Sequence, residues 1–300
     1  SSAMPATARI VTDAGSLTLG GVVDGAGGIT KAGDGTLVLT GSNNYAGDTT
    51  VSVGVLNIRN SLALGTTAGN AIVSSGAALE LQGGITVASG GALRNISDDN
   101  VWQGTMTMTA ATTVNVVDGS LTLSGAIGGN FALTKEGAGT LILSTSNSTT
   151  ASIAVNAGTL VAGATGALGT AAGGVTVASG AALGFQGNAV LVADPLSIGG
   201  TGILNAGAIR NISGTNSFAG AITLTADTLV NTATSTALTL GGVIGGNFAL
   251  TMDGAGALTL SGANTYTGGT TVSGGTLMGT TTSLQGDIAN DATLSFSQAV

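Results

Sequence analysis

The sequence lacks cysteine and histidine, and it has little charge of either sign. Without cysteine, disulfides, thiol catalysis and cysteine-ligated zinc are excluded. Without histidine, Ser-His-Asp and Cys-His nucleophilic systems and imidazole metal ligands are excluded as well. The chain has six basic residues and a net charge of −8. Nucleic-acid binding needs clustered cations, so it is excluded too.

What the chain does contain is glycine, at 53 of 300 residues, and 43% hydrophobic residues. Intrinsic disorder combines low hydrophobicity with high charge, and this composition has neither. Two prolines are too few for collagen. Gly, Thr, Ser or Asn interrupts each apolar run well before the ~18 residues of a membrane-spanning helix. Many short strands joined by tight turns account for such a composition.

Long segments of the sequence recur. The phrase SLTLGG at Ser16 returns as SLTLSG at Ser120 and as ALTLGG at Ala237, which gives periods of 104 and 117 residues. We therefore divide the chain into an N-terminal scar or cap-like segment, 1–15, and a single domain, 16–300, built of repeats 16–119, 120–236 and a truncated 237–300. We interpret the whole as an excised fragment, since SSAMPATARI is unlike a signal peptide.

Within each repeat, apolar and polar residues alternate with the period of a β-strand. Leu37 and Leu39 are expected to point inward, whereas Thr36, Val38 and Thr40 point outward. A sandwich gives little reason for ~100 residues to recur, whereas each coil of a solenoid contacts equivalent positions of its neighbours. The sequence therefore predicts an all-β, right-handed parallel β-helix (β-solenoid) of about 14 coils.

Two of the recurring phrases carry a family resemblance. GDGTLVLTGSNNYAGDTTVSVGVLNI at Gly33 and GAGALTLSGANTYTGGTTVSGGTLM at Gly254 resemble the passenger-associated repeat of bacterial autotransporters. The copy at Gly137 departs from the pattern, because it lacks the tyrosine and the glycine that follows. Flanking segments such as SGAALELQGGITVASGGALRNIS are similar to autotransporter-associated β-strand repeats.

This resemblance implies a passenger domain secreted across a Gram-negative outer membrane through a β-barrel translocator in the parent chain. It also implies a role of the repeat in passenger translocation and folding. We expect a non-catalytic stalk or adhesin at the cell surface, without cofactors or membrane insertion. Its partners would be host cells, matrix or sister passengers. Ice binding would need a regular Thr-x-Thr in every coil, and such patterns are sporadic here.

A β-helix enzyme acting on glycans is the alternative, and it would need converging carboxylates. The fourteen acidic residues are scattered, and only Asp98 and Asp99 are adjacent. Gly214 and Thr215 replace them in the second repeat, so a solvated turn is the favoured interpretation. Acids near the first repeat phrase do not have the spacing of a calcium-binding β-roll. No catalytic or metal-binding residue is predicted.

Two further patterns have both a structural and a functional interpretation. The phrase RNIS recurs, and its Asn95 and Asn211 match a glycosylation sequon. A turn that places asparagine in the left-handed region explains this recurrence better. Trp102 aligns with Phe218, which indicates packing in the coil, although aromatic residues can also form a sugar-binding platform.

One segment breaks the repeat. Copy two holds 12 extra residues near Ala189–Gly200, with the sequence AVLVADPLSIGG. They form either a loop that leaves the solenoid or about half an extra coil, and the alternation of Val190, Val192, Leu196 and Ile198 favours added strand. Loops on solenoids often carry binding. The candidate partner-binding residues are therefore Val190, Val192, Asp194, Pro195, Trp102, Asp98 and Asp99.

Overall fold

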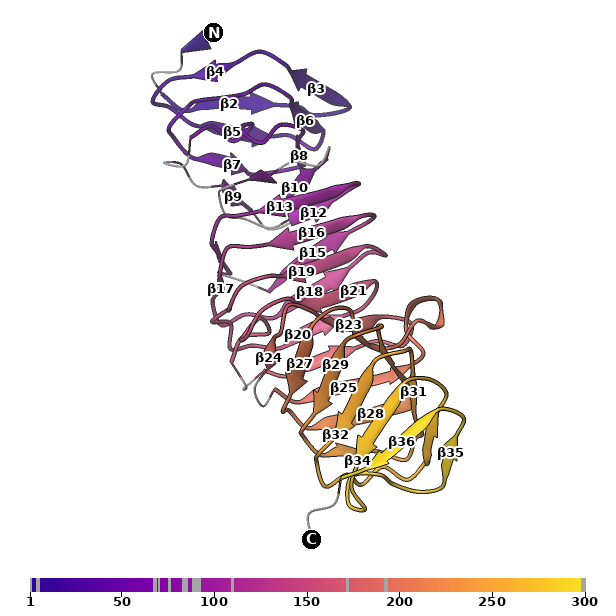
Figure 1. The fold of residues 1–300 in the computed structure, drawn as a ribbon. Coiled ribbons are helices and arrows are strands. Elements are labelled where there is room, and N and C mark those ends of the chain that lie inside the picture. The colour runs from indigo at the N-terminus through magenta and orange to yellow at the C-terminus, as the bar shows by residue number, and fades with distance from the viewer. Residues whose placement is uncertain are drawn as a thin grey trace. The chain divides into compact units, whose positions relative to one another are not determined.

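The computed structural model is built almost entirely of short parallel strands (Figure 1). It describes residues 2–3, 6–66, 69, 71–74, 77–82, 86–87, 93–108, 111–170, 173–191 and 194–297. Most strands pair in parallel with an equivalent strand of a neighbouring coil, so the strands stack as a β-solenoid of about 13 turns. The predicted fold class is confirmed, with about one turn fewer than the predicted 14. None of the helical segments described could cross a membrane.

The chain divides into two compact units. Unit 1 comprises Ser1–Met108 and Thr112–Gly128, and unit 2 comprises Thr109–Ala111 and Gly129–Val300. The strands of unit 1 are β1 (Ser2–Ala3), β2 (Ala8–Val11), β3 (Ser16–Leu19), β4 (Val23–Asp24), β5 (Ile29–Ala32), β6 (Thr36–Leu39), β7 (Thr49–Val51), β8 (Val55–Ile58), β9 (Ala71–Val73), β10 (Ala78–Leu81), β11 (Thr86–Val87), β12 (Leu93–Asn95), β13 (Asp99–Trp102), β14 (Met106–Thr107), β15 (Thr112–Val116), β16 (Ser120–Leu123) and β17 (Ile127–Gly128).

Unit 2 contains the remaining strands and one 3₁₀ turn, η1. They are β18 (Leu133–Glu136), β19 (Thr140–Leu143), β20 (Ile153–Val155), β21 (Thr159–Ala162), β22 (Val175–Val177), β23 (Ala182–Phe185), β24 (Val190–Leu191), β25 (Leu196–Gly200), η1 (Ile203–Asn205), β26 (Ile209–Asn211), β27 (Thr215–Phe218), β28 (Ile222–Thr232), β29 (Ala237–Leu240), β30 (Ile244–Gly245), β31 (Leu250–Asp253), β32 (Ala257–Leu260), β33 (Thr270–Val272), β34 (Thr276–Gly279), β35 (Ile288–Asn290) and β36 (Thr293–Phe296).

The core consists of columns in which equivalent apolar residues stack from coil to coil. In unit 1, strands β3, β6, β8, β10 and β12 place leucine on leucine in register, and four of these five side chains are buried. In unit 2, β29, β32, β34 and β36 form a second leucine column. The leucines of the two columns are Leu17, Leu37, Leu56, Leu79 and Leu93, and Leu238, Leu258, Leu277 and Leu294. Such stacking removes apolar surface from water, which stabilises the fold by ~25 cal/mol for each Å² buried.

The inward positions expected for Leu37 and Leu39 are confirmed, because both side chains are fully buried. Val38 faces outward as expected, but it is nevertheless buried, since only 5% of it is accessible. Val38 stacks on Asn57, and Asn57 stacks on Glu80. Arg59 and Arg94 bind Asn57 and Glu80, so long side chains cover this outward column.

The 12 extra residues of copy two enlarge one coil. Leu79 pairs with Leu93 in unit 1, whereas the equivalent Leu183 pairs with Ile209 in unit 2, so the second coil contains the whole insertion. Within it, β25 stacks between β22 and β28, with Leu196 and Ile198 buried. The interpretation as added strand therefore agrees with the structure, and η1 follows as a short projecting turn.

Candidate functional site

The most regular polar feature of the repeats is a buried asparagine at each copy of the quoted phrase. Asn43, Asn147 and Asn264 each donate from Nδ2 to a carbonyl of the next coil, at 2.7, 2.5 and 2.6 Å. The Oδ1 atoms of Asn43 and Asn264 each accept a backbone N–H of the previous coil at 2.8 Å. Each of these two amides therefore bridges three coils, which satisfies backbone groups that would otherwise be buried without partners.

Two lysines are also buried at equivalent turns. Lys31 Nζ donates to the carbonyls of Ala32, Gly33 and Val53 at 3.0, 2.6 and 3.0 Å. Lys135, 104 positions later, donates to three equivalent carbonyls at 2.8, 2.8 and 3.1 Å. Burial lowers the pKa of both amines, to about 8 for Lys135, although nearby carboxylates raise it in part. Met252 occupies the equivalent position in the third copy.

The tyrosine of the repeat forms a buried hydroxyl pair. Tyr45 and Tyr266 lie 2.5 and 2.7 Å from the hydroxyls of Thr49 and Thr270. The middle copy has Thr149 and Ile153 at these positions, so both members of the pair are absent together. The hydroxyl of Thr149 is buried without a hydrogen bond. These asparagine, lysine and tyrosine side chains hold turns together and are not accessible for chemistry.

The interpretation of RNIS as a turn with left-handed asparagine is wrong. Asn95 and Asn211 lie in strands β12 and β26 and are buried. Each accepts a hydrogen bond from a second buried asparagine, Asn100 or Asn216, at 2.5 and 2.7 Å. Both therefore belong to the core and are not accessible to glycosylation.

Asp98 and Asp99 occupy a turn and the strand after it. Asp98 has φ 64°, and Gly214, its equivalent in copy two, has φ 77°. The left-handed turn thus explains why aspartate alternates with glycine here. Asp99 is exposed at the start of β13 and accepts a hydrogen bond from Ser120 at 2.8 Å. Neither carboxylate faces a second acid across a cleft among the residues described.

The aromatic candidate is in the core. Trp102 is fully buried in β13, where it pairs in register with Leu123 of β16. Its equivalent Phe218 is also fully buried, with its ring 6.1 Å from that of Phe185. Neither ring is at the surface, so neither can serve as a sugar-binding platform.

The candidates of the inserted segment differ in accessibility. Val190 is 51% exposed in β24, and Pro195 is exposed at the start of β25. Val192 lies outside the residues that the structure describes. Asp194 is only 3% exposed, and its Oδ1 has no hydrogen-bond partner. Because burial disfavours the charged carboxylate, the pKa of Asp194 is raised to about 6.

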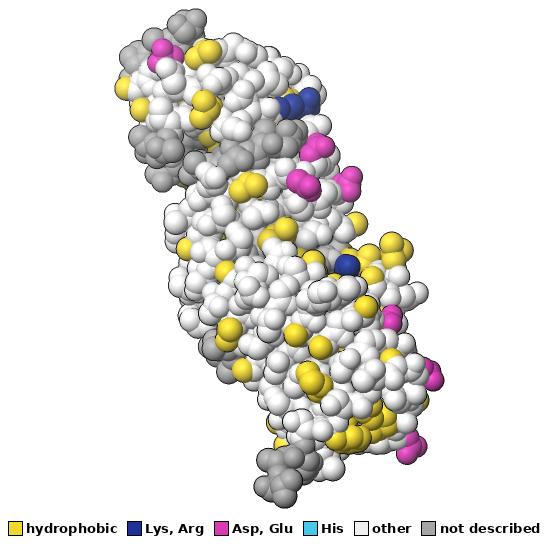
Figure 2. Space-filling view, viewed as in Figure 1, with side chains coloured by type: hydrophobic (Ala, Val, Ile, Leu, Met, Phe, Trp, Pro, Cys, Tyr) yellow, Lys and Arg dark blue, Asp and Glu magenta, His cyan; other side chains and the backbone are white. Residues whose placement is uncertain are grey.

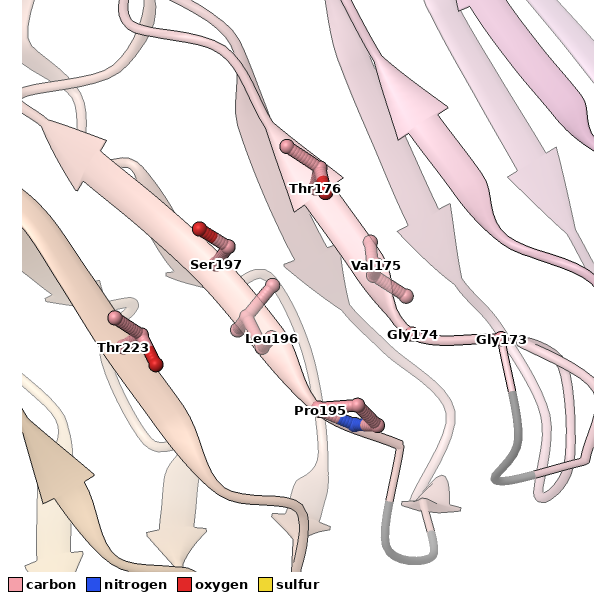
Figure 3. A pocket seen from close by; sticks show the side chains of 8 residues that line it. All are labelled: Gly173, Gly174, Val175, Thr176, Pro195, Leu196, Ser197 and Thr223. Carbon is pink, nitrogen blue, oxygen red and sulfur yellow. The ribbon is translucent and has the colours of Figure 1, made fainter.

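A shallow hollow of about 210 Å³ lies beside Pro195 (Figure 3). Thr176, Ser197 and Thr223 line it from β22, β25 and β28, where they occupy one row in register. Figure 3 shows their side chains turned to the same side of the three strands. Ligand pockets usually enclose about 300–1,000 Å³. This hollow therefore suits a surface contact with many small hydroxyls better than an enclosed small molecule.

Charged side chains are sparse on the face in Figure 2. Among the residues described, no three acidic side chains gather closely enough to hold a metal ion. Sequence reasoning did not single out the buried lysines or the hydroxyl row Thr176–Ser197–Thr223. The recurrence of Lys31 and Lys135 at 104 residues was a usable signal for the former. The hydroxyl row could not be predicted, because β25 lies in the insertion and its register with β22 and β28 has no counterpart in the first copy.

Comparison with known proteins bears on the same repeats. The model of the passenger-associated-transport-repeat family matches residues 29–58, 133–162 and 250–278. These segments contain the buried lysine or methionine and the bridging asparagines described above. The chain is also 41% identical over 80 residues to the adhesin BmaC autotransporter of Brucella suis biovar 1 (strain 1330). That alignment covers 27% of this chain and 2% of the adhesin. No solved structure is significantly similar.

The three family matches coincide with the three copies of the phrase found in the sequence. The middle match includes the copy without tyrosine, so the resemblance extends to the divergent repeat. The predicted kinship is therefore confirmed: this chain carries three passenger-associated transport repeats and resembles the passenger domains of bacterial autotransporters.

Proposed function

We propose that this chain is a non-catalytic stalk from the passenger of a surface-displayed or secreted autotransporter, and that it mediates adhesion. The partners would be a host cell, the extracellular matrix or a sister passenger. The observation that carries the proposal is the outward row Thr176–Ser197–Thr223, in which three strands in register present small hydroxyl groups over a shallow hollow. Similarity to an autotransporter adhesin supports it.

The buried polar contacts support a second role, in the folding of the passenger during secretion through an outer-membrane translocator of the parent chain. The amides of Asn43 and Asn264 each bond to both neighbouring coils, so each is satisfied only when the next coil has docked. A solenoid can fold by adding one coil to the next, because each coil contacts only its neighbours. The repeats would therefore stabilise each newly exported coil on the one before it.

The adhesive function is tested with fluorescent beads that carry the purified chain. Their retention is measured on epithelial cell layers, on matrix proteins and on a surface coated with the chain itself. The matched control is the triple variant Thr176→Ala, Ser197→Ala, Thr223→Ala, which removes the hydroxyls and leaves the buried side chains in place. We expect retention on at least one surface and its reduction in the variant. Beads that are retained on none of the three would overturn adhesion.

A further inference from the structure

One outward column of unit 2 contains three polar side chains without a hydrogen bond or ion pair to any residue that the structure describes. Arg210 in β26 pairs in register with Asn231 in β28, and Asn231 pairs in register with Asp253 in β31. All three are partly exposed. In the part of the chain that the structure describes, none of their side chains has a hydrogen bond or an ion pair. The column therefore presents a cation, an amide and an anion on consecutive coils.

Unit 1 contains the matched case, and there the arginine is occupied. Arg94, the equivalent of Arg210, forms an ion pair with Glu80 of the neighbouring strand. In copy two, Gly184 replaces Glu80 and is the strand neighbour of Arg210. A single change between the copies has removed the carboxylate and left the guanidinium free to bind an external one.

An exposed apolar side chain lies beside the same column. Leu204 in η1 is 95% exposed and has φ 51°, a left-handed conformation that is costly for leucine. A hydrogen bond of 2.8 Å from Gly207 N to Thr201 O closes the turn. At its base, a Cβ added to Gly207 would lie 2.9 Å from Asn231 Cβ, so the turn rests on the middle of the column. Strain of this kind is typical of contact and functional sites.

The order of charges makes the column self-complementary. Adjacent strands lie ~4.8 Å apart, so Arg210 and Asp253 sit about equally far on either side of Asn231. A twofold axis that runs along the strand direction through Asn231 reverses the stacking direction and exchanges the two ends. It places Arg210 of one copy opposite Asp253 of the other, twice, and Asn231 opposite Asn231. Reciprocal contacts of this kind define an isologous interface.

We propose that this column, with Leu204 beside it, is the surface through which two copies of this chain associate side by side in antiparallel orientation. The inference rests on the proposed adhesive function and names a second copy as the partner. Arg210 and Asp253 supply two charge-assisted pairs, whose planar fork geometry fixes the register. The same rotation turns Leu204 toward the residues preceding β31, where Phe248 is exposed.

Two chains of net charge −8 repel each other, and the two matched pairs offset part of this repulsion. A contact made of two exposed pairs and one apolar knob is small, so the association is weak and reversible. It is also sensitive to salt, since ion pairs exposed to solvent become weaker as the ionic strength rises.

Charge reversal tests the proposal by sedimentation velocity over a concentration series reaching ~1 mM at low salt, where dimers in the weak range of affinity are populated. Arg210→Asp and Asp253→Arg, each alone, place like charges opposite each other, and we expect each to weaken dimerisation at least about tenfold. An equimolar mixture of the two variants restores both pairs, as does the double variant. Asp287→Arg, an exposed reversal outside the column, is the matched control and is expected to leave dimerisation unchanged.

Leu204→Ser tests the apolar part of the contact, because it removes the exposed leucine and leaves the charged residues in place. We expect this variant to weaken dimerisation about tenfold without any change in its salt dependence. A wild-type chain that stays monomeric throughout would overturn the proposal, as would dimers that persist in both single reversals or a mixture that does not restore them. Retention on cells or matrix of beads that carry the Arg210→Asp variant measures the adhesive function without dimerisation. Failure of the dimerisation proposal and failure of the adhesive function can therefore be told apart.

Discussion

The hydroxyl pair of Tyr45 and Thr49 is expected to contribute measurably to the stability of unit 1. The two oxygens lie 2.5 Å apart and both residues are buried. Tyr45→Phe keeps the ring but leaves the Thr49 hydroxyl buried without a partner. Thr49→Val keeps the shape but leaves the Tyr45 hydroxyl with a single long contact, 3.5 Å to the Ala63 carbonyl.

The cost follows from the asymmetry between removing one partner and removing both. An unpaired buried hydroxyl costs about 1–3 kcal/mol, so each single substitution should destabilise the unit by that amount. Removing both partners leaves nothing unpaired, so the double variant should cost about 1–2 kcal/mol less than the sum of the singles. The middle repeat, with Thr149 and Ile153, lacks both members in the same way.

Urea unfolding followed by tryptophan fluorescence measures these costs. Trp102 is the sole tryptophan and is buried in the same unit as Tyr45, so its emission reports the relevant coils. Thr149→Val, followed by circular dichroism, is the matched control, because that hydroxyl already has no partner and its removal should not destabilise the chain but stabilise it by up to about 1–3 kcal/mol. Additive single costs, or an unchanged midpoint in Tyr45→Phe, would refute the reasoning.

Two pH-dependent predictions follow from the buried ionisable groups. The native pKa of Lys135 is about 8, below the ordinary 10.5. Between these pH values the unfolded chain therefore binds more protons than the native chain. The free energy of unfolding should rise by about 3 kcal/mol as the pH increases from ~8 to ~10.5. Lys135→Met, which introduces the residue that the third repeat has at Met252, should make the rise in urea midpoints smaller and leave the part that comes from Lys31. A rise as large as that of the wild type would contradict the prediction. The native pKa of Asp194 is about 6 against 3.8, so the native state binds more protons and stability should fall as pH increases from ~4 to ~6. Asp194→Asn should raise the free energy of unfolding by about 1–3 kcal/mol at pH 7, because it removes a charge that is buried without a partner. A variant that is no more stable than the wild type to thermal unfolding would contradict this prediction.

The inward columns were predictable because the same residues alternate with period two in every copy. Leu141 and Leu258 repeat the position of Leu37, and all three are buried. Stacking makes such positions interdependent, since each leucine contacts its equivalent one coil away. The pattern in one coil is therefore evidence about the next, and the number of coils could be estimated to within about one.

Buried polar residues could not be assigned in the same way. Lys31 and Lys135 have the sequence context of exposed charges, and Asn95 and Asn211 that of turn residues. Their burial depends on where carbonyls of two coils converge, as those of Gly137 and Ala157 do around Lys135. That convergence is a property of the assembled coils and is not visible in the local sequence pattern.

Outward positions can differ between the copies with little effect on the core, which favours them as contact surfaces. Leu79 and Leu183 are equivalent and both fully buried, whereas their neighbours Glu80 and Gly184 differ. An inward change must be matched by the coils above and below, because a mismatch leaves a cavity or overpacks the core. An outward change needs no such compensation. Replacing one carboxylate by glycine can therefore free Arg210 for external contacts at little cost to the core. A repeated scaffold can acquire different contact surfaces by this route while its coils continue to stack.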